Sequence, residues 1–178
     1  MDITTVQALS ALAMVFAITG SGLMVHKRYE EGAKAFLLGN TINIMVALGV
    51  GDVAFLASQA ALAAYTLPMY KSKSFSAFLI GMAIVLLWAV GISSGFHFTL
   101  DPVSGVGAVL AIIGARAMYK GQFNLMGWMW IIADPMFIYV GLQHGLTGLV
   151  LQSAVFTWHG VLRVTGMKQT GIFTFTKA

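Results

Sequence analysis

The chain has 178 residues, of which 58% are hydrophobic and only 9% are charged. Soluble globular domains carry about 25% charged residues, so this composition excludes that class and indicates an integral membrane protein. The absence of cysteine excludes disulfides, thiolate metal sites and cysteine nucleophiles. The formal net charge of +4 comes from basic residues in short loops beside apolar segments, a pattern of membrane topology that predicts no nucleic-acid partner.

Seven apolar segments follow one another along the chain, each close to the ~20 residues that cross a bilayer as a helix. The expected spans are Thr4–Val25, Ala33–Gly49, Val53–Tyr70, Phe75–Ser94, Val103–Tyr119, Asn124–Leu142 and Gly145–Thr165. The loops between them are too short to hold a soluble domain. The sequence therefore predicts an all-α polytopic protein, with a single membrane domain over residues 1–178 and a polar cytoplasmic tail over 166–178.

The basic residues sort completely by side when seven spans are assumed. All ten Lys and Arg residues fall on the side of the C-terminus, whereas the opposite side carries Asp2, Asp52 and Asp101. By the positive-inside rule, the C-terminus is then cytoplasmic and the N-terminus lies outside. The expected location is the inner (plasma) membrane of a bacterium.

An internal repeat relates the two halves of the chain. Sliding the sequence by 94 positions without a gap superposes the first three spans on the last three, so that Asn40 falls on Asp134 and Gly51 on Gly145. Two three-helix units separated by one linking helix point in the same direction, as in transporters with parallel repeats. The expected architecture is 3+1+3, with repeat one at about 4–70, the linker helix at about 75–94 and repeat two at about 102–165.

Asp134 is the only carboxylate that falls in the middle of a predicted span, and Pro135 follows it directly. A charged Asp at the centre of a membrane helix costs ~2.5–3.5 kcal/mol, and such residues mark functional sites by default. Trp130, Asp134 and Phe137 are spaced i, i+4 and i+7, so they share one helix face. The alternative interpretation is an Asp that only hydrogen-bonds a neighbouring helix, with Trp130 as packing.

Three further helix faces offer polar and aromatic side chains to the same site. They are Phe36, Asn40 and Asn43 on the second span, Ser58 or Gln59 with Tyr65 on the third, and Gln152, Phe156 and His159 on the seventh. A flat aromatic cation would stack on Trp130 and pair with Asp134, and the amides would suit ribose hydroxyls. Taken singly, each amide is equally well explained by ordinary hydrogen bonding between helices.

Three stretches carry a resemblance to a known family: Gly127-x-x-Trp130-x-x-x-Asp134, the turn Leu142-Gln143-His144-Gly145-Leu146, and Phe156 with Gly160. Over about residues 10–167 the chain resembles the PnuC vitamin B3 transporters, whose 3+1+3 arrangement is shared with SWEET sugar transporters. The family motif is Trp-x-x-Trp-x-x-x-Asn/Asp, and its paired Trp residues are implied to sandwich the base of nicotinamide riboside. Here Gly127 stands at the first Trp position, and Trp128 lies on another face.

We therefore predict a facilitative transporter of a small polar, ring-bearing solute, which the resemblance implies is nicotinamide riboside or a related vitamin or nucleoside. A SWEET-like carrier of a sugar or another solute is the first alternative, and a membrane scaffold or partner-binding subunit without transport is the second. No paired carboxylates, nucleophile–base pair or metal-ligand spacing occurs, so we expect no enzyme activity, metal or cofactor. Besides the solute and the bilayer, coupling to a cytoplasmic kinase and homo-oligomerisation stay open.

Overall fold

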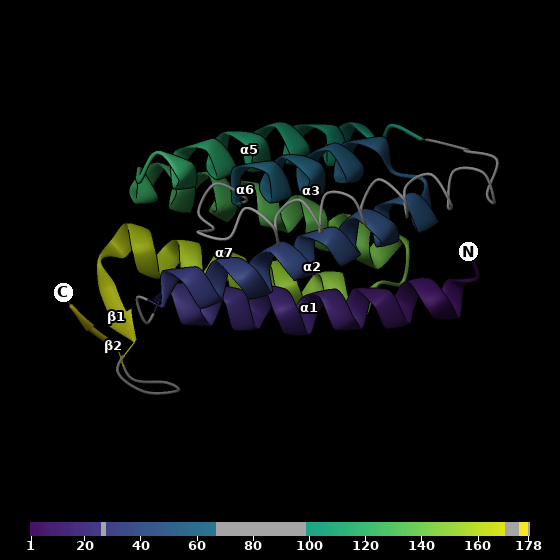
Figure 1. Ribbon diagram of the computed structural model, residues 1–178. Coiled ribbons are helices and arrows are strands. Elements are labelled where there is room, and N and C mark those ends of the chain that lie inside the picture. The colour runs from purple at the N-terminus through teal and green to yellow at the C-terminus, as the bar shows by residue number, and fades with distance from the viewer. Residues whose placement is uncertain (26–27, 67–98, 170–174, 178) are drawn as a thin grey trace.

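The computed structural model describes residues 1–25, 28–66, 99–169 and 175–177, which form a helical bundle (Figure 1). In this part of the chain the helices are α1 (Ile3–Val25), α2 (Tyr29–Val50), α3 (Val53–Thr66), α5 (Pro102–Tyr119), α6 (Phe123–Gln143) and α7 (Thr147–Thr165). Strands β1 (Met167–Gln169) and β2 (Phe175–Lys177) pair in an antiparallel hairpin after α7. The predicted fourth span, 75–94, lies outside the described residues, as do residues 67–70 of the third.

The helix bounds follow the apolar segments closely, with one difference. Helix α2 begins at Tyr29, four residues before the predicted start at Ala33. Its first turn holds Glu30 and Glu31, which favour a helix N-terminus because their charge complements the helix dipole. The helix therefore extends beyond its apolar part into a polar first turn.

Four of the described helices, α1, α2, α5 and α6, are long and apolar enough to cross a membrane. Helix α3 is apolar and shorter, with 14 residues. Helix α7 has 19 residues, yet Gln152, His159 and Arg163 make it more polar than those four. The chain is thus a helical protein of membrane character.

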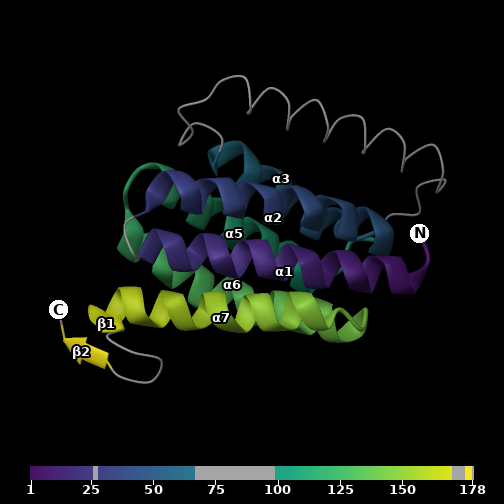
Figure 2. The same cartoon turned by 60° about the horizontal axis from the view of Figure 1, so that its bottom comes forward.

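The six described helices pack in a ring. The principal contacts join α1 to α2, α2 to α3, α3 to α5, α5 to α6, α6 to α7, and α7 back to α1. Figure 2 shows α1 between α2 and α7. We call α1–α3 one unit and α5–α7 the other. Each contact has a counterpart when the units are exchanged: α1–α2 corresponds to α5–α6, α2–α3 to α6–α7, and α3–α5 to α7–α1.

The turns after α2 and α6 are equivalent and lie at the same end of the bundle. Gly51 and Gly145, which are 94 positions apart, both have left-handed backbone conformations, with φ of 73° and 65°. Glycine adopts this conformation without the steric cost of a Cβ atom. We call this end the turn end, because helices α1, α3, α5 and α7 all begin there. The opposite end, where α2 and α6 begin, is the basic end.

The described basic side chains all lie toward the basic end of the bundle. They are Arg28 and Lys34 at the start of α2, Arg116 and Lys120 at the end of α5, and Arg163 in the last turn of α7. The N-terminus and the C-terminus lie at opposite ends of the bundle (Figures 1 and 2). Among these residues, the charge sorting expected from the sequence is therefore also a sorting in space.

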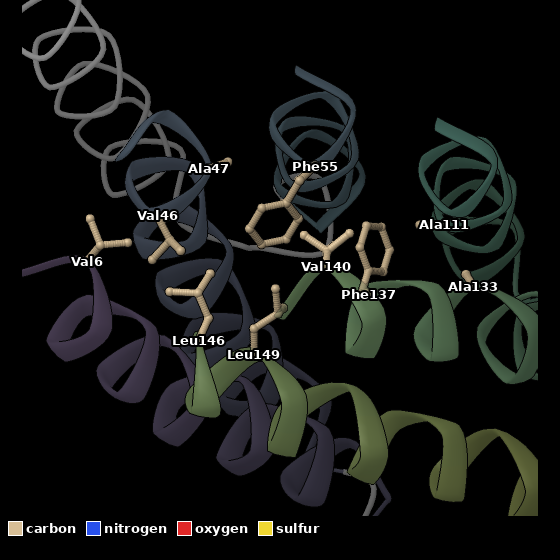
Figure 3. Packing of buried hydrophobic residues seen from close by; sticks show 10 residues of the cluster. All are labelled: Val6, Val46, Ala47, Phe55, Ala111, Ala133, Phe137, Val140, Leu146 and Leu149. Carbon is tan, nitrogen blue, oxygen red and sulfur yellow. The ribbon is translucent and has the colours of Figure 1, made fainter. Parts of the chain in front are cut away.

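Two apolar clusters fill the ring, and both draw residues from both units. The turn-end cluster consists of Val6, Val46, Ala47, Phe55, Ala111, Ala133, Phe137, Val140, Leu146 and Leu149 (Figure 3). The basic-end cluster consists of Ala17, Phe36, Leu62, Ala115, Ala117, Met118, Met126, Trp130 and Phe156. Figure 3 shows Phe55 of α3 and Phe137 of α6 turned toward the same space, and their ring centroids are 5.6 Å apart.

Glycines at equivalent positions let the first two helices of each unit approach closely. A Cβ atom on Gly20 would lie 2.6 Å from the backbone nitrogen of Phe36. A Cβ atom on Gly114, 94 positions later, would lie 3.1 Å from the ring of Trp130, which is itself 94 positions after Phe36. The repeat read from the sequence thus recurs as a repeat of contacts.

Candidate functional site

A small cavity lies where the two apolar clusters meet. It is lined by Phe36, Gln59, Leu62, Ala111, Trp130, Asp134, Phe137, Leu149, Gln152, Ser153 and Phe156. Its volume is about 20 Å³, which is room for about one water molecule. This space is too small for a ring-bearing solute, which could bind here only if the lining side chains moved apart.

Asp134 supplies the carboxylate of this cavity. The residue is 7% exposed, and within the described residues its Oδ2 atom has no hydrogen-bond partner. Helix α6 continues through Pro135, which directly follows the carboxylate. A buried acceptor without a donor is rare in proteins, because the lost hydration is not replaced. The unpartnered oxygen therefore requires a donor from outside the described residues, and water or a ligand in the cavity could supply it.

Three nearly parallel aromatic rings form one wall of the cavity. The ring centroids of Trp130 and Phe156 are 5.5 Å apart, and those of Phe36 and Phe156 are 5.6 Å apart. Phe36 and Trp130 are 6.3 Å apart, and the planes of the three pairs are inclined by 17–27°. Such a stack presents flat faces from α2, α6 and α7 to one space. It is a surface suited to another flat ring.

Amide side chains complete the polar part of the site. Asn43 Nδ2 donates to Gln152 Oε1 at 3.1 Å, which links α2 to α7. Gln59 Oε1 and Asn43 Oδ1 have no partner within the described part of the chain. Asn40 is completely buried, and both polar atoms of its amide are likewise unpartnered there, although Asn40 does not line the cavity. Acceptor atoms outnumber donors among these unpaired groups, which favours a ligand rich in N–H or O–H donors.

The structure brings six of the ten predicted site residues to the cavity. They are Trp130, Asp134, Phe137, Gln152, Phe156 and Gln59. Asn43 reaches this group through its bond to Gln152. The shared face of α6 that was predicted from the i, i+4, i+7 spacing is thus the face that lines the cavity.

The predicted site residues His159 and Tyr65 do not line the cavity. His159 Nδ1 lies 2.6 Å from Ser21 Oγ, at the interface of α1 and α7. The ring centroid of Tyr65 lies 6.0 Å from that of Tyr119, at the interface of α3 and α5. Each lies about one helical turn beyond a residue that lines the cavity, Leu62 before Tyr65 and Phe156 before His159, in the direction of the basic end. At that level their side chains lie between neighbouring helices.

The structure also explains the departure from the Trp-x-x-Trp pattern. A Cβ atom on Gly127 would lie 3.0 Å from Val164 Cγ2 and 3.2 Å from the carbonyl oxygen of Gly160. The α6–α7 crossing therefore leaves no room for a Trp at this position. Trp128 is 52% exposed on the outer face of the bundle. The second large ring beside Trp130 comes instead from Phe36, on the other unit.

Sequence reasoning missed the contribution of Leu62 and Ser153 to the cavity. The 94-residue offset would have found both, because it pairs Leu62 with Phe156 and Gln59 with Ser153. It likewise pairs Phe36 with Trp130. The cavity is therefore built largely from equivalent positions of the two units.

Comparison with protein-family models, with curated proteins and with solved structures finds no match to this chain. The resemblance to PnuC transporters therefore stays a prediction based on the residues quoted above. The function is inferred from the geometry of the cavity and from the chemistry of the residues that line it.

Proposed function

We propose that this chain is a facilitative membrane transporter of a small polar solute with a flat ring, which binds in the cavity between the two units. The observation that carries the proposal is that Trp130 and Asp134 line the cavity from one face of α6, with Asp134 Oδ2 unpartnered among the described residues. A helix contact that served packing alone would leave neither an empty space nor an unpaired acid. Both are expected where a solute binds and leaves.

The chemistry of the lining selects the class of solute. The aromatic faces and the carboxylate favour a flat cation, whose attraction to a desolvated aromatic ring is about 2 kcal/mol. Gln59 and Gln152 add amide groups that can bond hydroxyls or a carboxamide. Nicotinamide riboside combines a positively charged ring, a carboxamide and ribose hydroxyls. We therefore propose it, or a related vitamin or nucleoside, as the substrate.

Transport would proceed by alternating access. Transporters built from parallel repeats hold the solute near the membrane midplane and move one repeat against the other. In this proposal the basic end faces the cytoplasm of a bacterial cell, and the N-terminus lies outside. Transport is uncoupled, and net uptake is sustained by a cytoplasmic kinase that phosphorylates the solute.

Uptake by proteoliposomes tests the proposal. Purified protein should exchange labelled nicotinamide riboside, and Trp130→Ala should abolish most of the exchange, whereas Trp128→Ala should behave as wild type because its side chain is on the outer face. A scaffold without transport predicts no exchange and no thermal shift with any vitamin, nucleoside or sugar. A shift with sugars alone would favour the SWEET-like alternative.

The uncoupled mechanism has its own test in cells. Uptake should persist when a protonophore is added and cellular nucleotide levels are held constant. A collapse of uptake under these conditions would show that transport is driven by protons, and the uncoupled mechanism would then be wrong.

A further inference from the structure

Ser10 of α1 makes a buried contact with the other unit at the turn end. Its Oγ atom accepts a hydrogen bond from the backbone N–H of Leu149, in the first turn of α7, at 3.0 Å. Ser10 is 1% exposed. The helices are very close here, since a Cβ atom on Gly148 would lie 2.4 Å from the backbone of Ser10.

Ser104 of α5 makes the corresponding contact from the second unit to the first. Its Oγ atom donates to Asp52 Oδ1 at 2.9 Å, and the same oxygen accepts from the backbone N–H of Phe55, in the first turn of α3, also at 2.9 Å. Ser104 is completely buried. Where α7 has Gly148, α3 has Ala54, and the contact to Ser104 is made through the Asp52 carboxylate.

The two contacts are equivalent in the repeat. Ser10 and Ser104 are 94 positions apart, as are Phe55 and Leu149. Ser10 accepts a first-turn N–H of α7 directly, whereas Ser104 donates to Asp52, whose carboxylate accepts the first-turn N–H of Phe55 in α3. Such N–H groups have no partner within their own helix.

The carbonyl groups of the two turns are also joined to the other unit. The N–H of Thr99, just before α5, donates to the oxygen of Gly51 at 2.7 Å. Gln7 Nε2 of α1 donates to the oxygen of Gly145 at 3.3 Å. The turn end thus carries hydrogen bonds between the units at both turns, although the donors at the two turns do not occupy equivalent positions of the repeat. Phe55 and Leu149, whose N–H groups take part in the serine contacts, belong to the turn-end cluster shown in Figure 3.

The basic end is held differently. Between the described parts of the two units, Ser21 contacts His159 and Tyr65 contacts Tyr119 there, through side chains, beside the apolar packing of the basic-end cluster. Neither pair involves the backbone of the other unit. The cavity lies between the two ends, and among the described residues the turn end carries more of the hydrogen bonds between the units.

We propose that Ser10 and Ser104 are paired gate residues that hold the turn end of the transporter closed. The inference rests on the proposed function, in which the two units separate to admit solute. Opening the turn end requires both serines to leave the other unit, and their loss should favour the state in which the cavity is open at that end.

Thiol accessibility tests the gate without any solute. The chain has no cysteine, so Ser153→Cys places a single reporter in the cavity lining. Vesicles are prepared with the protein inserted in either orientation and treated with a membrane-impermeant methanethiosulfonate. The rate at which the cysteine is labelled is then measured from each side of the membrane. Adding Ser10→Ala or Ser104→Ala should raise the rate about fivefold for each hydrogen bond lost, only from the side that faces the turn end.

Matched controls separate the gate from a general loosening of the bundle. Thr41→Val removes a buried hydroxyl that bonds only the Leu37 oxygen of its own helix, at 2.9 Å, and should not change the rate. Ser21→Ala removes the contact at the basic end and should not raise labelling from the turn end. Size-exclusion profiles and melting temperatures establish that each variant is folded.

The outcomes separate this inference from the proposed function. Faster labelling from the turn end in folded serine variants supports the gate even if no solute is ever transported. Unchanged labelling in folded Ser10→Ala and Ser104→Ala proteins overturns it, even if nicotinamide riboside is transported. An equal rise in the Ser21→Ala or Thr41→Val protein also overturns it, because the effect would then not depend on the turn end.

Discussion

Phe36 and Trp130 stack on each other across the two units, with their ring centroids 6.3 Å apart and their planes inclined by 17°. They are separated by 94 positions, so they occupy equivalent places in the repeat. The stack joins the two units beside the cavity, and Asp134 lies one turn further along α6.

Removing either ring should weaken solute binding. Aromatic pairs contribute about 0.5–1.5 kcal/mol beyond the area they bury, so Trp130→Ala and Phe36→Ala should each weaken binding by about 3- to 10-fold. Trp130→Phe should retain most of the affinity, because a flat face remains. Isothermal titration with nicotinamide riboside measures the effect. Equal affinity in wild-type and Phe36→Ala protein would exclude Phe36 from the site.

Asp134→Asn should separate binding from stability. The amide has the shape of the carboxylate but carries no charge to be desolvated, so we expect a higher melting temperature and weaker binding of a cationic solute. Asp101→Asn is the matched control, because Asp101 accepts the N–H groups of Val103 and Ser104 at the start of α5 and Asn caps helices equally well. A cation bound equally well by Asp134→Asn protein would contradict the assigned role.

Two glycine substitutions should change the free energy of unfolding in opposite directions. Gly148→Ala should lower the free energy of unfolding by about 1–3 kcal/mol, because the new methyl group would meet the backbone of Ser10 at 2.4 Å. Gly22→Ala on α1 should raise it by about 0.5–1 kcal/mol, because nothing lies within 4 Å of the added carbon and Ala favours the helix. Unfolding in detergent followed by circular dichroism measures both. Equal effects would show that the α1–α7 contact is looser than described.

Placing a Trp at position 127, as the PnuC motif has it (Gly127→Trp), should destabilise the protein. The indole would need the space that Val164 and the carbonyl of Gly160 occupy. We expect a lower yield of monodisperse protein and a lower melting temperature. A well-folded variant with tighter nicotinamide riboside binding would instead show that the α6–α7 crossing can open to accept the ring.

The orientation in the membrane can be checked with fusions. A fluorescent protein fused after residue 178 should fluoresce in the bacterial cytoplasm, whereas alkaline phosphatase fused at the same point should be inactive there. We expect this result because loops rich in Lys and Arg stay on the cytoplasmic side, and the C-terminus lies on the side of the basic residues. Active phosphatase at the C-terminus would reverse the assignment of the two ends.

Parts of the site could be predicted because they depend on short spacings. Trp130, Asp134 and Phe137 share a face in any helix, whatever packs against it. Helical spacing does not show whether Tyr65 and His159 line the cavity, because it gives the face of a helix but not how far the cavity extends along the helix axis. Phe36 was on the expected face of the second span, but its contact with Trp130 follows from the packing of α2 against the other unit.

The amino-acid sequence by itself determined the membrane character, the approximate helix bounds, the separation of basic residues from the opposite side, and the 94-residue repeat. These depend on local length, charge and periodicity, which need no knowledge of neighbours. Only the tertiary structure decided that Phe36 stacks on Trp130, that Ser10 and Ser104 bond to the other unit, and that the cavity has room for about one water molecule. Those contacts depend on the distances between helices. Small residues such as Gly127 and Gly148 allow a close approach, but the sequence does not show which neighbouring helix they contact.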